Sequence, residues 1–255
     1  ALLHIFSPDS GIGKTTALFA GASVWGDPTK IVLKESDTMN SKMLRAELYN
    51  NIFLPMDEMT NSTAKELSDF LYQYTSGTQK NRLASSANQE RHRGEPWNQT
   101  AVSTGNSSMM EKMSTYKALP KGEAMRLLEV RAQPVSGLDK AVTDKLSEKI
   151  LNNYGHAYLP YLQYVMDDIE GIKNLYKTTQ MKLDKICGFT PADRFHSVLA
   201  ADGIMGLMVA KKAGLIDYDV KAVVQWLVNI VKGLKEQVKS MDVDAETTLT
   251  NFLAE

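Results

Sequence analysis

Residues 2–16, LLHIFSPDSGIGKTT, consist of an apolar run, a glycine-rich turn and the start of a helix-forming segment. The apolar run Leu2–Phe6 predicts a strand, and the pattern from Lys14 to about Trp25 predicts a helix. A P-loop requires this order, because its glycines let backbone N–H groups surround a phosphate at the positive end of a helix dipole. The alternative is a chance Gly-Lys-Thr in a surface turn.

The predicted ATP contacts lie within this turn and the first residues of the helix. Lys14 would reach the β- and γ-phosphates, and the hydroxyl of Thr15 would hold Mg²⁺. Pro8 stands where the usual pattern has its first glycine, so we expect Ser7 and Gly11 to supply the bend. The expected ATP-binding residues are Ser10, Gly11, Ile12, Gly13, Lys14, Thr15 and Thr16.

A second apolar run, residues 52–56, ends in the acidic pair Asp57-Glu58. ATP hydrolysis needs a carboxylate near Mg²⁺ and often a second one that polarises the attacking water. We therefore expect Asp57 to serve the metal, through water, and Glu58 to act as general base. An ordinary acidic turn at the end of a strand is the alternative reading of this pair.

A third predicted strand, residues 100–103, is followed by Thr104-Gly105-Asn106. A polar side chain at this strand end would lie between the acidic strand and the γ-phosphate, where it can orient the lytic water. Asn106 is the first candidate for this catalytic role and Thr104 is the second. A simple turn after a strand is the alternative.

The remaining pattern alternates strands and helices in the first half and is dominated by helices in the second. Further strands are expected at residues 30–34 and 124–130, and a polar connector at 134–151. This order predicts an α/β P-loop NTPase core with a mainly parallel sheet, over residues 1–135, followed by a helical C-terminal lid over residues 136–255.

Composition excludes several classes of protein. The chain has 255 residues, 43% of them hydrophobic, and a formal net charge of −1, which disfavours disorder and a protein that coats nucleic acid over its whole surface. The single cysteine cannot form an internal disulfide, and no apolar run is long enough to span a membrane. We expect a cytoplasmic protein with no membrane partner.

Residues 76–97 are poor in apolar side chains and contain a cluster of cations. Cations in a groove bind the phosphates of a single strand regardless of its sequence, and His92 would stack on a base. The expected nucleic-acid contacts are Lys80, Arg82, Arg91 and Arg93. A solvated polar loop is the alternative.

Several segments together resemble a known family. The P-loop helix with Ala22-Ser23-Val24-Trp25-Gly26, the acidic strand, residues 122–130 (GEAMRLLEV) and residues 193–203 resemble the phage and plasmid ATPases known as domain of unknown function 927. The resemblance covers nearly the whole chain. That family is similar to superfamily 3 helicases and other AAA+ ATPases, so the resemblance implies an AAA+/RecA-like core.

The resemblance also implies an activity and an assembly. It implies an ATP-driven helicase or translocase that acts on single-stranded DNA in phage or plasmid replication, as a hexameric ring in a bacterial or phage-infected cell. Such rings complete each active site with an arginine from the neighbouring subunit, for which Arg126 is the candidate and Arg131 the competitor. A structural arginine paired with a carboxylate at the edge of the core is the alternative. The alternative function is an ATP-gated assembly or loader module with weak hydrolysis and no unwinding.

Overall fold

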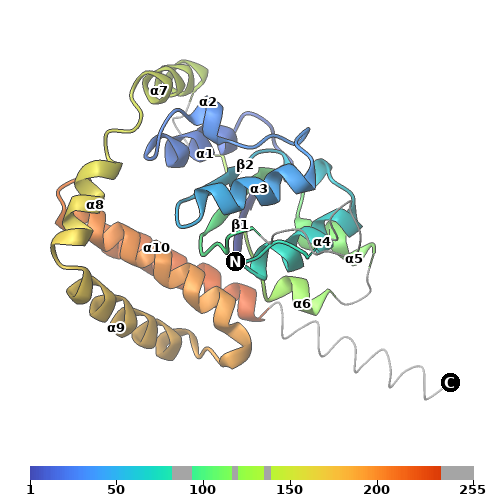
Figure 1. The fold of residues 1–255 in the computed structure, drawn as a ribbon. Helices are drawn as coiled ribbons and strands as arrows, with labels where there is room; N and C mark the ends of the chain where they lie inside the picture. The colour runs from blue at the N-terminus through green and yellow to red at the C-terminus, as the bar shows by residue number, and fades with distance from the viewer. Residues whose placement is uncertain (82–93, 117–119, 135–138, 237–255) are drawn as a thin grey trace, which may run out of the picture. The chain divides into compact units, whose positions relative to one another are not determined.

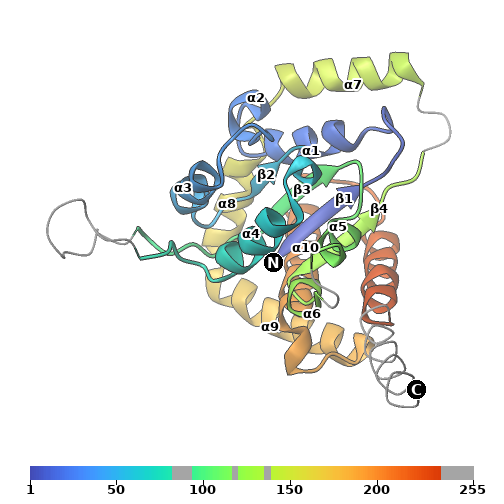
Figure 2. The same cartoon turned by 90° about the vertical axis from the view of Figure 1, so that its right-hand side faces the viewer.

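The computed structural model describes residues 1–81, 94–116, 120–134 and 139–236. The chain has a mixed α/β fold with a four-stranded parallel sheet (Figures 1 and 2). Contacts divide it into two compact units, one formed by residues 1–116 and 129–158 and the other by residues 117–128 and 159–255. The division into an ATPase core and a lid at residue 135 remains a prediction. Residues 140–152, which form helix α7, lie in the first of these units.

The strands of the sheet lie in the order β2-β3-β1-β4. Their bounds are β1 Leu2–Phe6, β2 Leu54–Met56, β3 Ala101–Gly105 and β4 Leu127–Arg131. β3 pairs in parallel with β1 and with β2, from Leu2 opposite Ala101 to Phe6 opposite Gly105 on one side. The strand predicted to carry the polar candidates therefore lies between β1, which precedes the glycine-rich turn, and β2, which precedes the acidic pair, and all three end at the same edge of the sheet.

Helices of the first unit cover the sheet and bury apolar faces against it. α1 packs against β2 and β3, and both α2 and α7 pack against α1. Leu18, Ala22 and Val32 form one buried cluster there, with Phe53 beside it. The helices of this unit are α1 Lys14–Ser23, α2 Pro28–Ile31, α3 Met39–Tyr49, α4 Ala64–Thr75, α5 Met109–Ser114 and α7 Lys140–Asn152, with the 3₁₀ turn η1 Met59–Asn61.

The strand expected at residues 30–34 is wrong. Asp27 accepts a hydrogen bond from the backbone N–H of Thr29 at 3.0 Å, and Pro28 occupies the first position of α2. The dipeptide Asp-Pro indicates the end of the preceding helix, but aspartate as a helix cap followed by proline at the first helical position also begins a helix. Only Leu33 reaches the sheet edge, in an isolated parallel bridge to Met56.

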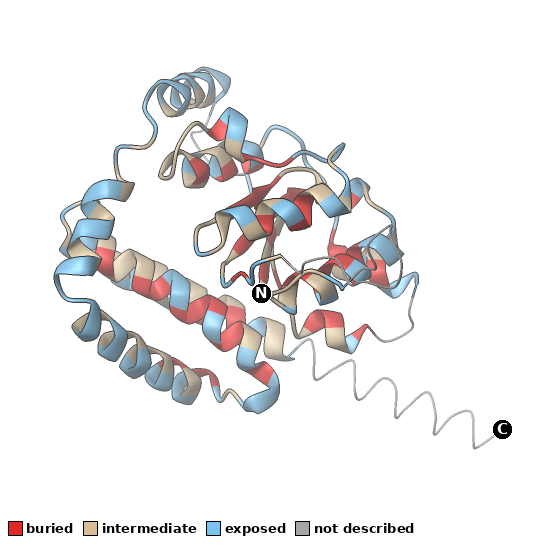
Figure 3. Cartoon of the chain, viewed as in Figure 1, coloured by how far each residue is buried: buried red, intermediate tan, exposed pale blue. Residues whose placement is uncertain are grey.

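Two other predicted segments also differ from the structure. Residues 121–124 form the short helix α6 (Lys121–Ala124), so the last strand begins at Leu127 and Arg126 does not lie on it. The expected connector at 134–151 contains α7, which Asp139 caps through the N–H of Val142 at 2.8 Å. α7 has no buried residue, as Figure 3 shows, and its apolar residues Val142 and Leu146 are exposed.

The second unit is mainly helical. Its elements are α6, α8 Tyr158–Asp167, α9 Ile169–Cys187, the 3₁₀ turn η2 Pro191–Asp193, α10 Arg194–Lys212 and a helix over residues 220–236. α9 packs on α10, whose buried face includes Leu199, Ile204 and Val209. His196 of α10 contacts the carbonyl oxygens of Ala124 and Leu127, each at 3.0 Å.

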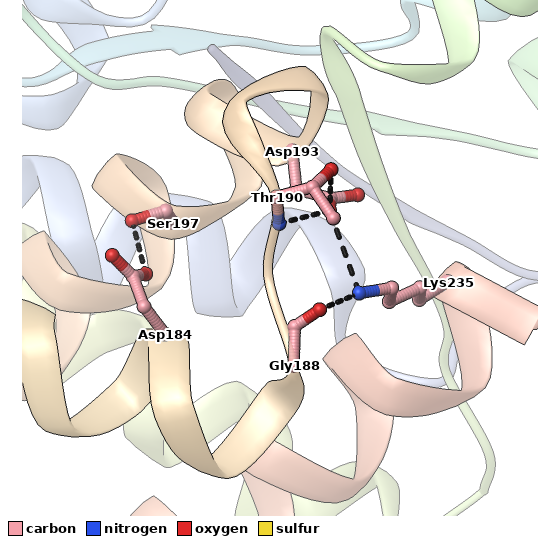
Figure 4. A network of polar contacts seen from close by, with 6 residues as sticks. All are labelled: Asp184, Gly188, Thr190, Asp193, Ser197 and Lys235. Atoms are coloured by element: carbon pink, nitrogen blue, oxygen red, sulfur yellow. Dashed lines mark hydrogen bonds and ion pairs between the residues drawn. The ribbon is translucent and has the colours of Figure 1, made fainter.

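A polar network joins the helix over 220–236 to the turn before α10 (Figure 4). Asp193 accepts hydrogen bonds from the N–H and the hydroxyl of Thr190, at 2.7 and 2.9 Å. Lys235 lies 3.5 Å from the same carboxylate and donates to the carbonyl of Gly188. Burial alone would raise the pKa of Asp193, but the Thr190 donors and Lys235 outweigh it and lower that pKa. This network fixes the start of α10.

Among the described residues, none of the helices combines the length and the apolar character that crossing a membrane requires.

Candidate nucleotide-binding site

The turn between β1 and α1 contains two glycines whose backbone lies in the left-handed region. Gly11 and Gly13 have φ values of +75° and +91°, which disfavour any residue with a Cβ. The Nζ of Lys14 donates to the carbonyl oxygens of Ser7 and Asp9, at 3.0 and 2.8 Å. Lys14 is only 8% exposed and forms no ion pair within the described ranges. Its charge therefore lies inside the turn and fits an anionic ligand.

The acidic pair follows β2 at the same sheet edge. The hydroxyl of Thr15, in the first turn of α1, donates to Oδ1 of Asp57 at 3.4 Å. The hydroxyl of Thr104, in β3, donates to the same oxygen. One hydroxyl and one carboxylate are a donor set that Mg²⁺ accepts, since this ion usually takes one or two protein carboxylates together with phosphates and water. Thr15 and Asp57 thus fit the predicted metal role.

Glu58 has an unusual backbone conformation. Its φ of 54° and ψ of 37° lie in the left-handed region, which non-glycine residues seldom adopt and which costs roughly 1–2 kcal/mol. Asn106 holds the side chain, because its Nδ2 donates to Oε2 of Glu58 at 3.0 Å. The backbone N–H of Asn106 donates to the hydroxyl of Thr60 at 3.1 Å. Strain at a non-glycine residue is typical of functional sites.

Close packing at the end of β3 requires a glycine. A Cβ on Gly105 would lie 2.5 Å from the Thr60 hydroxyl and 2.9 Å from the ring of His4. The carbonyl of Gly105 also accepts the N–H of Ser7 at 3.3 Å, where the glycine-rich turn begins. Gly105 therefore brings the ends of β1, β3 and the acidic turn together.

His4 lies fully buried in β1 beneath this edge. Its Nε2 contacts the carbonyl of Ser107 at 3.1 Å, and its Nδ1 contacts the hydroxyl of Ser103 at 2.9 Å. Because a carbonyl can only accept, Nε2 carries the proton and Nδ1 accepts from Ser103. Burial lowers the pKa of His4 to about 4, against the opposing effect of these hydrogen bonds. The ring is therefore neutral at pH 7.

The low pKa of His4 predicts a pH-dependent stability. The unfolded chain, with an ordinary histidine pKa of 6.5, takes up a proton at higher pH than the folded chain. Stability is therefore complete above about pH 6.5, falls as the pH drops toward about 4, and levels off below that. The pKa difference corresponds to about 3 kcal/mol.

Urea unfolding between pH 4 and 7 measures this loss. The control is His4→Gln, which keeps a polar side chain but cannot titrate, so its curve should be flatter by about that amount over the same interval. Parallel curves for the two proteins would contradict the assignment of the loss to His4.

The other predicted site residues have the following places. Ser10 and Ile12 lie in the turn, whereas the hydroxyl of Thr16 lies 3.5 Å from that of Ser147 in α7. Arg126 belongs to the second unit, where its Nη1 donates to the carbonyl of Gly122 at 2.7 Å and its guanidinium lies over the ring of Phe195. The competitor Arg131 ends β4 and is exposed.

The basic segment is described only at its two ends. Lys80 is exposed, and Arg82, Arg91, His92 and Arg93 lie outside the described residues. Glu47 of α3 accepts hydrogen bonds from the side chain of Gln79 and, at 3.0 Å, from the N–H of Glu95. One carboxylate thus binds Gln79 and Glu95, on either side of the undescribed residues.

Sequence reasoning missed two residues of this region. Thr60 supports Asn106 through its hydroxyl, and its carbonyl accepts from Lys112. Lys42 of α3 is buried beside the loop that precedes that helix. Neither residue belongs to a motif, so only their positions in space reveal them.

Comparisons with known proteins agree with this fold. Residues 1–94 match the family described as "Domain of unknown function (DUF927)". No curated protein sequence matches the chain. A solved structure titled "SCCmec type IV Cch - active helicase" is similar, with a TM-score of 0.70 and 16% sequence identity. The similarity covers 98% of this chain and 46% of that one, so this chain spans less than half the length of the solved protein. This chain therefore has the fold of part of a helicase, and its first 94 residues are similar to the DUF927 domain.

Proposed function

We propose that this chain is the ATP-hydrolysing motor of a helicase or translocase that acts on single-stranded nucleic acid. The observation that carries the proposal is the meeting of three chain segments at one sheet edge. Thr15 of the P-loop helix and Thr104 of β3 both donate to Asp57, and Asn106 donates to Glu58. A turn with a buried lysine beside such an acidic pair suits phosphoryl transfer to water.

Each residue has a definite part in the proposed reaction. Lys14 exchanges the carbonyl oxygens of Ser7 and Asp9 for phosphate oxygens when nucleotide binds. Thr15 and Asp57 hold Mg²⁺, which neutralises charge on the phosphates when bound. Glu58 takes a proton from the attacking water as general base.

Asn106 orients the Glu58 carboxylate that performs this step. Its amide donates to one carboxylate oxygen and leaves the other free to accept the proton of the water. Thr104, the second candidate from the sequence, instead contacts the carboxylate proposed to serve the metal. Thr104 thus contacts Asp57, and Asn106 contacts Glu58.

We further propose that the basic segment contacts the nucleic acid and that the assembled protein is a homo-oligomer, with a hexameric ring as the expected form. The similarity of fold to a helicase supports the proposed contact with nucleic acid. The hydrogen bonds of Gln79 and Glu95 to Glu47, which fix the residues on either side of the basic cluster, also support it. Arg126 is the proposed arginine donated to a neighbouring subunit's site. Phage or plasmid replication is the proposed setting.

The deciding experiment is the rate of ATP hydrolysis by the full-length protein with and without single-stranded DNA. We expect several-fold stimulation that weakens as salt is raised, because phosphate contacts release counterions. Replacing Lys80, Arg82, Arg91 and Arg93 together with alanine should remove the stimulation, whereas Lys65→Ala, an exposed lysine on α4, should not.

Other outcomes favour the alternative. Tight ATP binding with slow hydrolysis that DNA does not change would point to an ATP-gated assembly or loader module. Stimulation by DNA that survives the fourfold alanine change would leave a motor but move the nucleic-acid contact elsewhere in the protein.

A further inference from the structure

Lys42 is a lysine that the protein buries almost completely. It lies in α3 and is only 1% exposed, although lysine is rarely buried without partners. Its Nζ donates to the carbonyl of Glu35 at 3.2 Å and to that of Asp37. These acceptors precede it by seven and five residues, the same spacing as the acceptors of Lys14. Lys42 therefore holds the loop of residues 34–38 from within.

That loop is ordered by further bonds of its own. The carboxylate of Asp37 accepts the N–H of Lys34 at 2.8 Å, and the hydroxyl of Thr38 caps α3 by accepting the N–H of Ser41 at 3.2 Å. With its backbone held by Lys42, the loop has a defined position against the end of β2.

The loop and Leu33, the residue before it, contact the acidic turn at two points. The carbonyl of Leu33 accepts the N–H of Asp57 at 2.8 Å. The carboxylate of Glu35 accepts the side chain of Asn61 at 2.8 Å. The N–H of Asn61 in turn donates to the carbonyl of Glu58 at 3.2 Å and closes the 3₁₀ turn. These contacts support the turn in addition to the hydrogen bonds of Asn106.

A glutamate whose backbone lies in the left-handed region persists only where surrounding contacts stabilise that conformation. Asn106 and Thr60 hold the turn through one set of hydrogen bonds, and Leu33 and Glu35 hold it through another. We propose that Lys42 is a positioning residue for the turn that carries Glu58. It acts through the loop of residues 34–38 and the contact between Glu35 and Asn61, and the proposal rests on the proposed hydrolysis of ATP.

The test compares kcat and KM for ATP hydrolysis by the full-length protein. Lys42→Met removes the ammonium but keeps a similar apolar length, and we expect kcat to fall about 10-fold with little change in KM. Lys34→Met, an exposed lysine in the same loop, is the matched control and should behave as wild type. Amide exchange at residues 57–61 should accelerate in Lys42→Met and not in Lys34→Met.

Two exposed residues, Asn61 and Glu35, can be changed with little risk to folding, so they test the proposal if Lys42→Met folds poorly. Asn61→Ala and Glu35→Ala should each lower kcat by a similar factor, because each breaks the same contact. Glu35→Gln retains an amide oxygen that can accept from Asn61, so it should recover much of the rate lost in Glu35→Ala. Combining Lys42→Met with Asn61→Ala should lower kcat no further than the larger single effect.

The outcomes separate this inference from the proposed function. If Glu58→Gln abolishes hydrolysis while Lys42→Met and Asn61→Ala keep the wild-type kcat, the positioning role of Lys42 is overturned and the motor assignment stands. An additive double variant overturns the path through Asn61. If the full-length protein hydrolyses no ATP, the proposed function fails, whereas faster amide exchange in Lys42→Met still supports the link between Lys42 and the turn.

Discussion

Lys14→Ala is expected to lower ATP hydrolysis by at least about 100-fold, the scale on which a lost transition-state contact reduces a rate. Lys14 supplies the buried positive charge inside the turn, and no other described lysine lies there to replace it. The measurement is steady-state phosphate release by the full-length protein, together with the affinity for a fluorescent ATP analogue.

The fold should survive this change with a moderate loss of stability. Two carbonyl oxygens, of Ser7 and Asp9, lose their donor, which corresponds to about 1–3 kcal/mol in the free energy of unfolding. Lys65→Ala on the exposed face of α4 is the matched control for removing a lysine. A folded Lys14→Ala protein with undiminished hydrolysis would refute the P-loop assignment.

Glu58→Gln should separate binding from chemistry. Glutamine keeps the size of the side chain and an oxygen that accepts from Asn106, but it cannot take a proton from water. We therefore expect Mg²⁺-ATP to bind normally and hydrolysis to fall at least about 100-fold. Single-turnover hydrolysis and nucleotide affinity are the two measurements.

Asp57→Asn is the paired variant with a different expected defect. It weakens the site that Thr15 and Asp57 form, so the affinity for ATP should lose its dependence on Mg²⁺. If both variants bind and hydrolyse ATP as wild type does, the acidic turn is structural only.

The elements nearest the site were predictable because they obey local rules. A strand, a glycine-rich turn and a helix follow one another at residues 2–23, and the acidic pair ends a short apolar strand. Parallel strands place their carboxyl ends at one edge, so the contact between Asp57 and Thr104 near the end of β3 follows from the fold class.

The misses have equally physical causes. Asp27-Pro28 has the chemistry of both a helix end and a helix start, and the short α2 replaced the expected strand. α7 was missed although Val142, Leu146 and Ile150 recur at helical spacing, because charged and polar residues make up most of the segment. Lys42 follows the pattern of a solvent-facing helix residue, and only the return of the loop at residues 34–38 buries it.

The left-handed backbone of Glu58 also bears on how this protein can be engineered. Asparagine or glycine adopts that conformation at lower cost, so selection for heat resistance alone would favour replacing the glutamate. Such a change would remove the proposed general base while improving the fold. Libraries screened for solubility or melting temperature should therefore keep position 58 constant, because at this position fold stability and the rate of ATP hydrolysis favour different residues.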